Sequence, residues 1–200
     1  MSRTALLLLD YQVAMCDPGP LGRQPALAAQ VAERDVLARA GKALEQARTA
    51  EMFVVHVRLA FDSSYELRTN AAARFAAYKD TNAMLVGSPE AQFMPDVTPL
   101  QSEPVVTKGG VDPFIGTPLL ELLLRNGISR VALGGVATNL VVESAARHAI
   151  DSGLQVFVLE DLCASFAPEL HEFAIARTLP LFAEVTDSES FLATAGAHGE

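Results

Sequence analysis

Short apolar runs rich in β-branched residues alternate along this chain with longer helix-like segments, and this alternation is the feature that most constrains its fold. The apolar runs cover residues 4–9, 52–58, 105–108, 131–136, 154–160 and 183–185. Helical patterns cover residues 26–49, 71–78, 116–125, 139–151, 168–179 and a last segment from 187. Strands that are continuously apolar are typical of a parallel sheet covered by helices on both faces. We therefore predict an α/β fold: a three-layer α/β/α sandwich with a mainly parallel, Rossmann-like sheet of roughly six strands.

The sequence predicts a single domain over residues 1–200, because chains of this size usually close one core. Half of the residues are apolar, which excludes a disordered chain. No internal repeat or long linker divides the sequence. Residues 60–103 are its least regular stretch, and we expect them to form much of a lid over any binding pocket.

Charge and cysteine content restrict the partners and the compartment. The formal net charge of −9, without any cluster of Lys and Arg, argues against nucleic acid. The apolar run at 5–9 is too short for a secretory signal, and polar and glycine residues interrupt the run at 131–142, so no membrane span is expected. Two distant cysteines, Cys16 and Cys163, form no disulfide framework. We expect a cytoplasmic protein that acts on a small molecule.

Three polar features fall at predicted strand ends: Asp10, Lys108 and the turn at 134–139. Taken singly, each has a structural explanation, as a turn former, a solvated lysine, and a tight turn with Thr138 or Asn139 as helix cap. In open parallel sheets, however, ligands bind at the carboxyl ends of the strands. Their shared placement therefore predicts a functional site at this edge.

Four stretches of the chain carry a family resemblance. They read Leu-Leu-Leu-Leu-Asp-Tyr-Gln at 6–12, Val-Val-Thr-Lys-Gly-Gly-Val-Asp-Pro-Phe at 105–114, Gly-Val-Ala-Thr-Asn-Leu-Val-Val-Glu-Ser at 135–144, and Val-Leu-Glu-Asp-Leu-Cys-Ala-Ser at 158–165. With them the sequence resembles the isochorismatase-like hydrolase superfamily, which includes nicotinamidases, N-carbamoylsarcosine amidases and isochorismatases. The resemblance extends from residue 4 to about residue 192.

The resemblance implies catalytic roles for Asp10, as acid or base, and for Lys108, as its charged neighbour. It also implies a cis peptide between Val136 and Ala137 and a nucleophilic cysteine on the first turn of the following helix. In this chain that nucleophile position is Val141. An isopropyl group has no proton to lose and no lone pair, so thiol-dependent amide hydrolysis at this position is excluded.

The two cysteines present are weighed as substitutes. Cys163 lies just after the fifth predicted strand, and a free cysteine is commonly a small buried hydrophobe. Cys16 lies six residues after Asp10 in a loop that could overhang the site, which leaves an amide hydrolase with a different nucleophile as one alternative.

Further site residues are predicted around this pair. We expect Gln12 to orient Asp10, Arg58 to contact a substrate carboxylate, Phe114 to cover the pocket, and Val136 and Ala137 to border it. His56 stands alone on a strand, so no metal site is predicted. The sequence has no dinucleotide fingerprint, Walker loop, His-Glu-x-x-His or Gly-x-Ser-x-Gly motif, and no cofactor is expected.

Two functions remain open. The favoured interpretation is an isochorismatase-like hydrolase that cleaves a vinyl-ether-type bond in a small carboxylate-bearing molecule, with Asp10 as general acid and no covalent thiol intermediate. The alternative is a catalytically degenerate family member that binds a small ligand or a partner. The resemblance also implies a homodimer or homotetramer.

Overall fold

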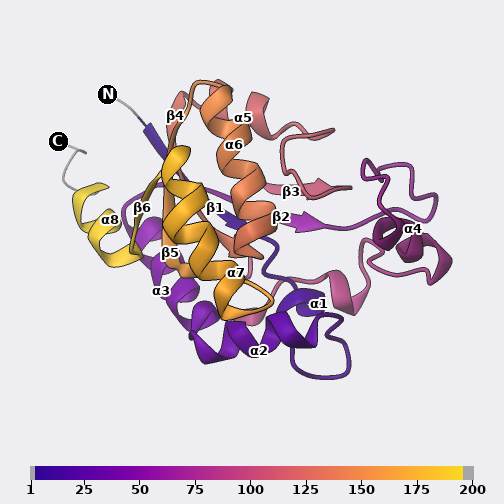
Figure 1. Cartoon of the computed structure of the whole chain (residues 1–200). Helices are drawn as coiled ribbons and strands as arrows, with labels where there is room; N and C mark the ends of the chain where they lie inside the picture. The colour runs from indigo at the N-terminus through magenta and orange to yellow at the C-terminus, as the bar shows by residue number, and fades with distance from the viewer. Residues whose placement is uncertain (1–2, 196–200) are drawn as a thin grey trace.

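The computed structural model describes residues 3–195 and confirms the predicted α/β architecture (Figure 1). Within this range six strands form one parallel sheet in the order β3-β2-β1-β4-β5-β6. The strands are β1 (Arg3–Leu9), β2 (Phe53–Leu59), β3 (Val105–Lys108), β4 (Ile128–Val136), β5 (Gln155–Ala164) and β6 (Glu184–Thr186). The strand order reverses beside β1, because β2 and β3 extend the sheet on one side and β4, β5 and β6 on the other. The carboxyl end of β1 is therefore the switch point at which such folds bind ligands.

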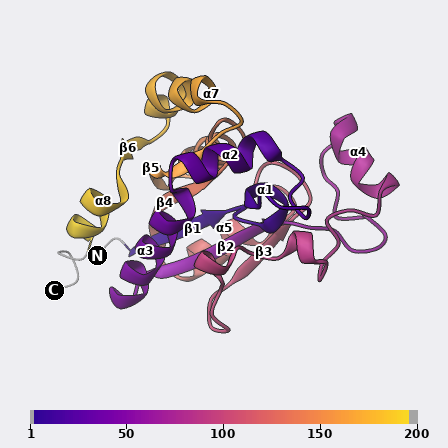
Figure 2. The ribbon, with the colours of Figure 1, turned by 90° about the horizontal axis from the view of Figure 1, so that it is seen from below.

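Helices cover both faces of this sheet (Figures 1 and 2). One face packs on α5 (Leu119–Arg125), α6 (Glu143–Asp151) and the π-turn η4 (Ala174–Thr178) that continues α7 (Pro168–Phe173). The other face packs on α2 (Pro25–Glu33), α3 (Val36–Thr49) and α8 (Ser188–Ala195). No helix within residues 3–195 is long and apolar enough to cross a bilayer.

Strand β1 lies at the centre of both cores. Leu7 and Leu9 pack in the core beneath α5 and α6, whereas Leu6 and Leu8 pack in the core beneath α2 and α3. Burial of each such side chain contributes about 1.5–3 kcal/mol. Because helices cover both faces of the sheet, side chains on both faces of β1 are buried. This explains why its leucines follow one another without a polar residue between them.

The segment after β2 builds a third, smaller cluster away from the sheet. The segment contains the short helix α4 (Ala73–Asp80) and the 3-10 turns η1 (Pro89–Ala91) and η2 (Pro95–Val97). The third cluster joins α4 to α1 (Val13–Cys16), and η1 contacts α1, whereas Val97 of η2 is buried in the core beneath α2 and α3. Figure 2 shows α4 standing apart from the sandwich, beyond the strand ends. The buried residues of the third cluster are Ala14, Leu59, Phe61, Tyr65, Phe75, Ala83 and Met84.

The expected continuous helix over 26–49 is wrong, because the chain breaks it into α2 and α3. Asp35, between them, has a φ of 52°, a left-handed conformation that aspartate tolerates better than most residues. The preceding Arg34 turns toward β5, where its Nε donates to the Cys163 carbonyl at 3.0 Å. A tertiary contact thus ends α2 where the local pattern would allow the helix to continue.

Smaller differences occur in four other elements. β4 begins at Ile128 rather than at 131, and β5 continues to Ala164 through a register shift opposite Leu133 and Gly135. The helices expected over 139–151 and 168–179 each contain a π-turn, η3 (Thr138–Val142) and η4. The η3 turn lies against β4 and β5, and Ala174 of η4 is buried in the core that also contains α5 and α6, so packing rather than helical periodicity sets the backbone at both turns.

Candidate active site

Asp10 is the first residue after β1 and leaves the strand in a left-handed conformation, with φ 61°. Its backbone N–H still donates to the Val57 carbonyl of β2 at 2.9 Å, so the turn begins only after the sheet hydrogen bonds are complete. The residue is 5% exposed. The sharp turn places the carboxyl group above the strand ends rather than on a face of the sheet.

Lys108, the last residue of β3, forms an ion pair with Asp10. Its Nζ lies 2.8 Å from Asp10 Oδ2 and donates a second hydrogen bond of 2.8 Å to the Gly110 carbonyl. The other carboxylate oxygen, Asp10 Oδ1, is buried and has no hydrogen-bond partner among the described residues. The predicted convergence of the two charged side chains is therefore present, with one carboxylate oxygen left unused by the protein.

Two opposing effects act on the Asp10 carboxyl. Burial raises its pKa, and the positive charge and hydrogen bond of Lys108 lower it; burial is the larger effect, so the pKa lies above its ordinary value. The neutral acid is therefore easier to populate here than at a solvated aspartate.

The glycine after Lys108 is required by a close approach of the lid segment. A Cβ on Gly109 would lie 1.5 Å from the Leu67 carbonyl oxygen, so any side chain would displace the loop that precedes α4. Thr69 N–H also donates to the Gly109 carbonyl at 3.1 Å. The same short stretch thus fixes Lys108 and seats residues 65–70 beside the site.

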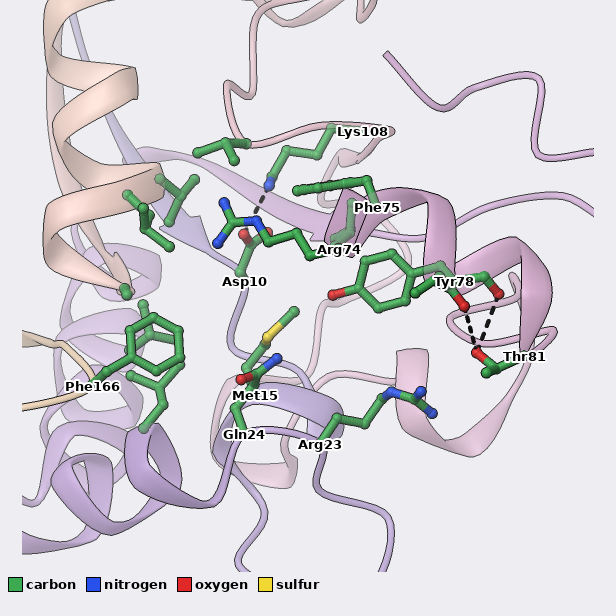
Figure 3. Close-up of a pocket in the computed structure, with 18 residues that line it drawn as sticks. Asp10, Met15, Arg23, Gln24, Arg74, Phe75, Tyr78, Thr81, Lys108 and Phe166 are labelled. Atoms are coloured by element: carbon green, nitrogen blue, oxygen red, sulfur yellow. Dashed lines mark hydrogen bonds and ion pairs between the residues drawn. The ribbon is translucent and has the colours of Figure 1, made fainter. Parts of the chain in front are cut away.

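A cavity of about 470 Å³ opens over the Asp10–Lys108 pair (Figure 3). Its apolar wall comes from α1, α2, the η3 turn, and the strand ends with the loops that follow them, and consists of Met15, Leu27, Leu59, Val111, Val136, Ala137, Leu140, Val141 and Phe166. Its opposite wall is α4, with Arg74, Phe75, Ala77, Tyr78 and Thr81. Arg23 and Gln24 complete the rim. The segment 60–103 therefore contributes one side of the cavity, as expected.

Val141 lies in the η3 turn and lines this cavity, at 2% exposure. The peptide between Val136 and Ala137, at the start of the turn, is cis, as the resemblance implied. Side chains from the loop after β5 and from α7 hold the turn: Ser165 Oγ donates to Asn139 Oδ1, and His171 Nδ1 lies 2.8 Å from Thr138 Oγ1. The position to which the resemblance assigns a nucleophile is therefore well fixed and carries a hydrocarbon side chain.

Neither cysteine is placed to supply a nucleophilic thiol in the cavity. Cys16 and Cys163 are buried and do not line the cavity. Burial, assisted by the negative charge of Asp10, raises the pKa of the Cys16 thiol far above its usual range, and burial raises that of Cys163 to about 12. Cys163 Sγ donates to the Leu159 carbonyl at 3.3 Å. Both thiols remain protonated near neutral pH, and thiolate is the nucleophilic form.

Gln12, expected to orient Asp10, is fully buried and instead holds the neighbouring strand end. Its Nε2 donates to the carbonyls of Leu59 at 2.9 Å and Ala91 at 3.0 Å, and its Oε1 accepts from Leu59 N–H at 2.8 Å. Because every hydrogen bond of the amide lies within the protein, Gln12 fixes the end of β2 between Asp10 and Lys108.

Arg58 and Phe114, expected to contact substrate, lie outside the cavity lining. Arg58 Nε donates to Thr107 Oγ1 of the neighbouring strand β3 at 3.0 Å. Phe114 stacks on His148 with ring centroids 4.6 Å apart. Val136 and Ala137 do line the cavity, as expected.

The histidines make other contacts. His56 Nε2 lies 2.9 Å from Glu103 Oε2, and His148 Nδ1 lies 3.1 Å from Asp112 Oδ2. Within residues 3–195 no group of three or more His, Cys, Asp or Glu side chains is arranged to hold a metal ion.

Sequence reasoning missed the cavity residues Arg23, Arg74, Tyr78 and Phe166. Arg74 and Tyr78 are four residues apart on α4, so they project from the same face of that helix. This spacing was visible in the sequence, but nothing local indicated that this face meets the cavity.

Comparisons with known proteins agree with this fold. A family model for the isochorismatase domain matches residues 4–190. The uncharacterized isochorismatase family protein YwoC of Bacillus subtilis (strain 168) is 27% identical over 193 residues, which cover 95% of this chain and 93% of YwoC. The uncharacterized isochorismatase family protein YecD of Escherichia coli O157:H7 is 28% identical over 189 residues, or 94% of each chain. A crystal structure of a cysteine hydrolase from Pseudomonas syringae pv. phaseolicola 1448A is similar with a TM-score of 0.85 at 20% identity, over 98% of this chain and 93% of that one.

The extent of the family match, together with a parallel sheet of the same fold, identifies the class of protein. The chain belongs to the isochorismatase-like hydrolase family.

Proposed function

We propose that this chain is a hydrolase that cleaves a vinyl-ether-type bond in a small carboxylate-bearing molecule, with Asp10 as general acid. The observation that carries the proposal is the buried Asp10–Lys108 pair beneath a cavity whose nucleophile position is Val141. A carboxyl of raised pKa supports proton donation, and an isopropyl wall supports a route without a covalent enzyme intermediate.

The chemistry then proceeds in two steps. The Asp10 carboxyl gives its proton to the terminal carbon of the vinyl ether, which converts the substrate into an oxocarbenium ion and leaves Asp10 as a carboxylate. Water adds to the cationic carbon and loses a proton, and the resulting hemiketal collapses to a ketone and an alcohol. Lys108, 2.8 Å from Asp10 Oδ2, stabilises the carboxylate that forms.

A substrate carboxylate has cationic partners in the cavity other than Arg58. Arg74 extends from α4 toward Asp10 in Figure 3, its Cζ lies 5.3 Å from the centroid of the Phe75 ring, and within residues 3–195 it forms no ion pair with an acidic side chain. Arg23 also lines the cavity but is paired with Glu90 at 2.9 Å. Arg74 is therefore the side chain that we assign to the substrate carboxylate.

The test is hydrolysis of isochorismate, a vinyl ether that carries carboxylates, followed by detection of the pyruvate released. We expect turnover by the native chain and a fall in kcat of about 10²–10⁴-fold in Asp10→Asn, which keeps the shape but loses the acid. Asp17→Asn is the matched control, because Asp17 lies just after α1, accepts a hydrogen bond of 3.0 Å from Gly19 N–H and is outside the cavity lining.

Two results would contradict the proposal: no turnover by the native chain, which favours the alternative of a binding protein, or equal turnover by Asp10→Asn. Assembly as a homodimer or homotetramer and a cytoplasmic location remain predictions, which analytical ultracentrifugation and cell fractionation would test.

A further inference from the structure

The hydroxyl groups of the three tyrosines in this chain have different surroundings. Tyr11 Oη donates to the Leu162 carbonyl, and Tyr65 Oη donates to the Ala83 carbonyl at 2.8 Å. Within residues 3–195, Tyr78 Oη has no such partner; it points into the cavity, toward the side on which Asp10 lies (Figure 3). A partly buried phenol usually has a hydrogen-bond partner. The missing partner of Tyr78 is therefore to be sought among the molecules that occupy the cavity.

The ring of Tyr78 is held in place by other aromatic side chains. Its centroid lies 5.6 Å from that of Phe61, at an interplanar angle of 39°, and 5.6 Å from that of Phe75, edge to face at 87°. Phe61 in turn is fully buried and forms backbone hydrogen bonds with Met84 and Val86. The position of the hydroxyl is thus determined before any ligand binds, which lowers the entropy lost on binding.

Charged groups surround this hydroxyl on more than one side. Burial raises the pKa of the Tyr78 phenol, the charges of Arg23 and Arg74 lower it, and the charges of Asp10 and Glu90 raise it. The net effect is a raised pKa, so the phenol is neutral near neutral pH and can donate a hydrogen bond. It cannot act as a phenolate base there.

The two walls of the cavity differ in polarity. Leu140, Val141 and Phe166 line the side opposite α4, whereas Arg74 and Tyr78 lie one helical turn apart on α4. A ligand that satisfies both walls places its hydrocarbon body against the first and its oxygen atoms against the second.

We propose that Tyr78 contacts the substrate and donates a hydrogen bond to a hydroxyl or carbonyl oxygen distinct from its carboxylate, so that the site selects oxygenated organic acids over their deoxy analogues. This inference deepens the proposed function, since it rests on the cavity being the substrate site. Tyr78 is a specificity-determining residue, and the proton in the reaction still comes from Asp10.

The test is a binding measurement that needs no turnover. Isothermal titration calorimetry compares benzoate with 3-hydroxybenzoate and 4-hydroxybenzoate, which add one hydroxyl to the same ring and carboxylate. We expect at least one hydroxy acid to bind the native chain about 3- to 10-fold more tightly than benzoate, the usual net effect of one hydrogen bond.

Two variants test whether the Tyr78 hydroxyl causes this preference for hydroxy acids. Tyr78→Phe removes only the hydroxyl, so the affinity ratio should fall to about one while the affinity for benzoate is unchanged. Tyr65→Phe is the matched control, because Tyr65 contacts the same Phe61 ring at 5.1 Å but its hydroxyl bonds to the Ala83 carbonyl outside the cavity lining. The ratio should be retained in this variant.

The proposal is overturned if Tyr78→Phe keeps the preference, if Tyr65→Phe loses it equally, or if the native chain binds none of the acids or does not prefer a hydroxy acid. These results are separate from the test of the proposed function. Absence of isochorismate turnover contradicts the role of Asp10 and leaves the hydroxyl preference in place, whereas turnover that depends on Asp10 without any hydroxyl preference contradicts Tyr78 alone.

Discussion

Lys108 Nζ lies 2.8 Å from Asp10 Oδ2, although β2 separates the two strands that these residues end. The lysine side chain therefore crosses over the end of β2, where Leu59 is paired in register with Lys108 and is held by the Gln12 amide. Both charged groups are almost fully buried, and the free energy of removing an ion pair from water offsets much of the attraction between its charges. The presence of such a pair beneath an open cavity is more readily explained by chemistry than by stability.

The pH dependence of turnover should respond to Lys108. Because the ammonium group lowers the pKa of Asp10, Lys108→Met should raise that pKa further and move the alkaline fall of kcat/KM to higher pH. The maximal rate should also drop about 10- to 100-fold, since the carboxylate that forms loses its counter-charge. The measurement is a pH–rate profile with isochorismate.

Lys79→Met is the control for this shift. Lys79 is exposed on α4, carries the same charge and does not line the cavity, so its profile should match that of the native chain. A Lys108→Met profile that shifts to lower pH, or not at all, contradicts the assigned coupling.

A cysteine introduced at position 141 should be accessible to a thiol reagent. In the native chain, Cys16 and Cys163 are buried and protonated, so iodoacetamide at pH 8 should modify the folded protein slowly. Val141→Cys places a thiol in the cavity that also contains the Lys108 ammonium, and we expect modification at least about 10-fold faster. Intact-mass spectrometry over time measures the rate, with Val86→Cys, at a residue 50% exposed, as the reference for an open thiol. Equal rates in Val141→Cys and the native chain would show that position 141 faces away from the cavity.

The sheet and the charged pair were predictable because each follows from local sequence and one geometric rule. The leucine run of β1 indicates a strand buried on both faces, and parallel strands bring their carboxyl ends to one edge. Asp10 directly follows one such run and Lys108 ends another, so their convergence could be predicted without knowing the structure of the loops.

The α4 wall was not predictable in the same way. Arg74 and Tyr78 reach the cavity because the segment 60–86 folds back, with Phe61 N–H donating to the Met84 carbonyl at 2.8 Å. That contact is tertiary, and polar residues on a short helix usually indicate a solvated face. The role of Gln12 was not predictable for a similar reason. A backbone β-bridge joins Gln12 to Phe93, which is distant in the sequence, and the buried Gln12 amide donates to the Ala91 carbonyl of the same distant segment.

Gln12 should therefore affect stability more than substrate binding. Gln12→Met keeps the length of the side chain but removes hydrogen bonds to Leu59 and Ala91, which leaves buried backbone groups without partners. We expect the free energy of unfolding to fall by about 2–4 kcal/mol and Tm to fall by about 5–15 °C. Thermal unfolding by circular dichroism measures the change, with the exposed Gln46→Met as control. A variant of native stability with impaired turnover would instead support the expected role of Gln12 in orienting Asp10.

Glu103 should make the fold sensitive to acid. Burial alone would raise the pKa of its carboxyl, but hydrogen bonds from Arg48, from Leu100 N–H and from His56 lower that pKa from 4.5 to about 2. A lowered pKa contributes stability that is complete above about pH 4.5 and is lost as the pH falls toward 2. Arg48 binds both carboxylate oxygens, at 2.8 and 2.7 Å, so the pair joins α3 to the loop before β3.

Glu103→Gln should accordingly lower the free energy of unfolding at pH 7 by about 1–2 kcal/mol once solvent screening is allowed for, and should flatten its dependence on pH below 4.5. Urea unfolding between pH 2 and pH 7 measures both effects. Glu121→Gln provides the comparison, because Glu121 pairs with Arg125 on the exposed surface of α5, where ion pairs contribute little. If Glu103→Gln loses stability below pH 4.5 as steeply as the native chain does, the acid sensitivity resides in other carboxylates, and the contacts of Glu103 with Arg48 and His56 do not control it.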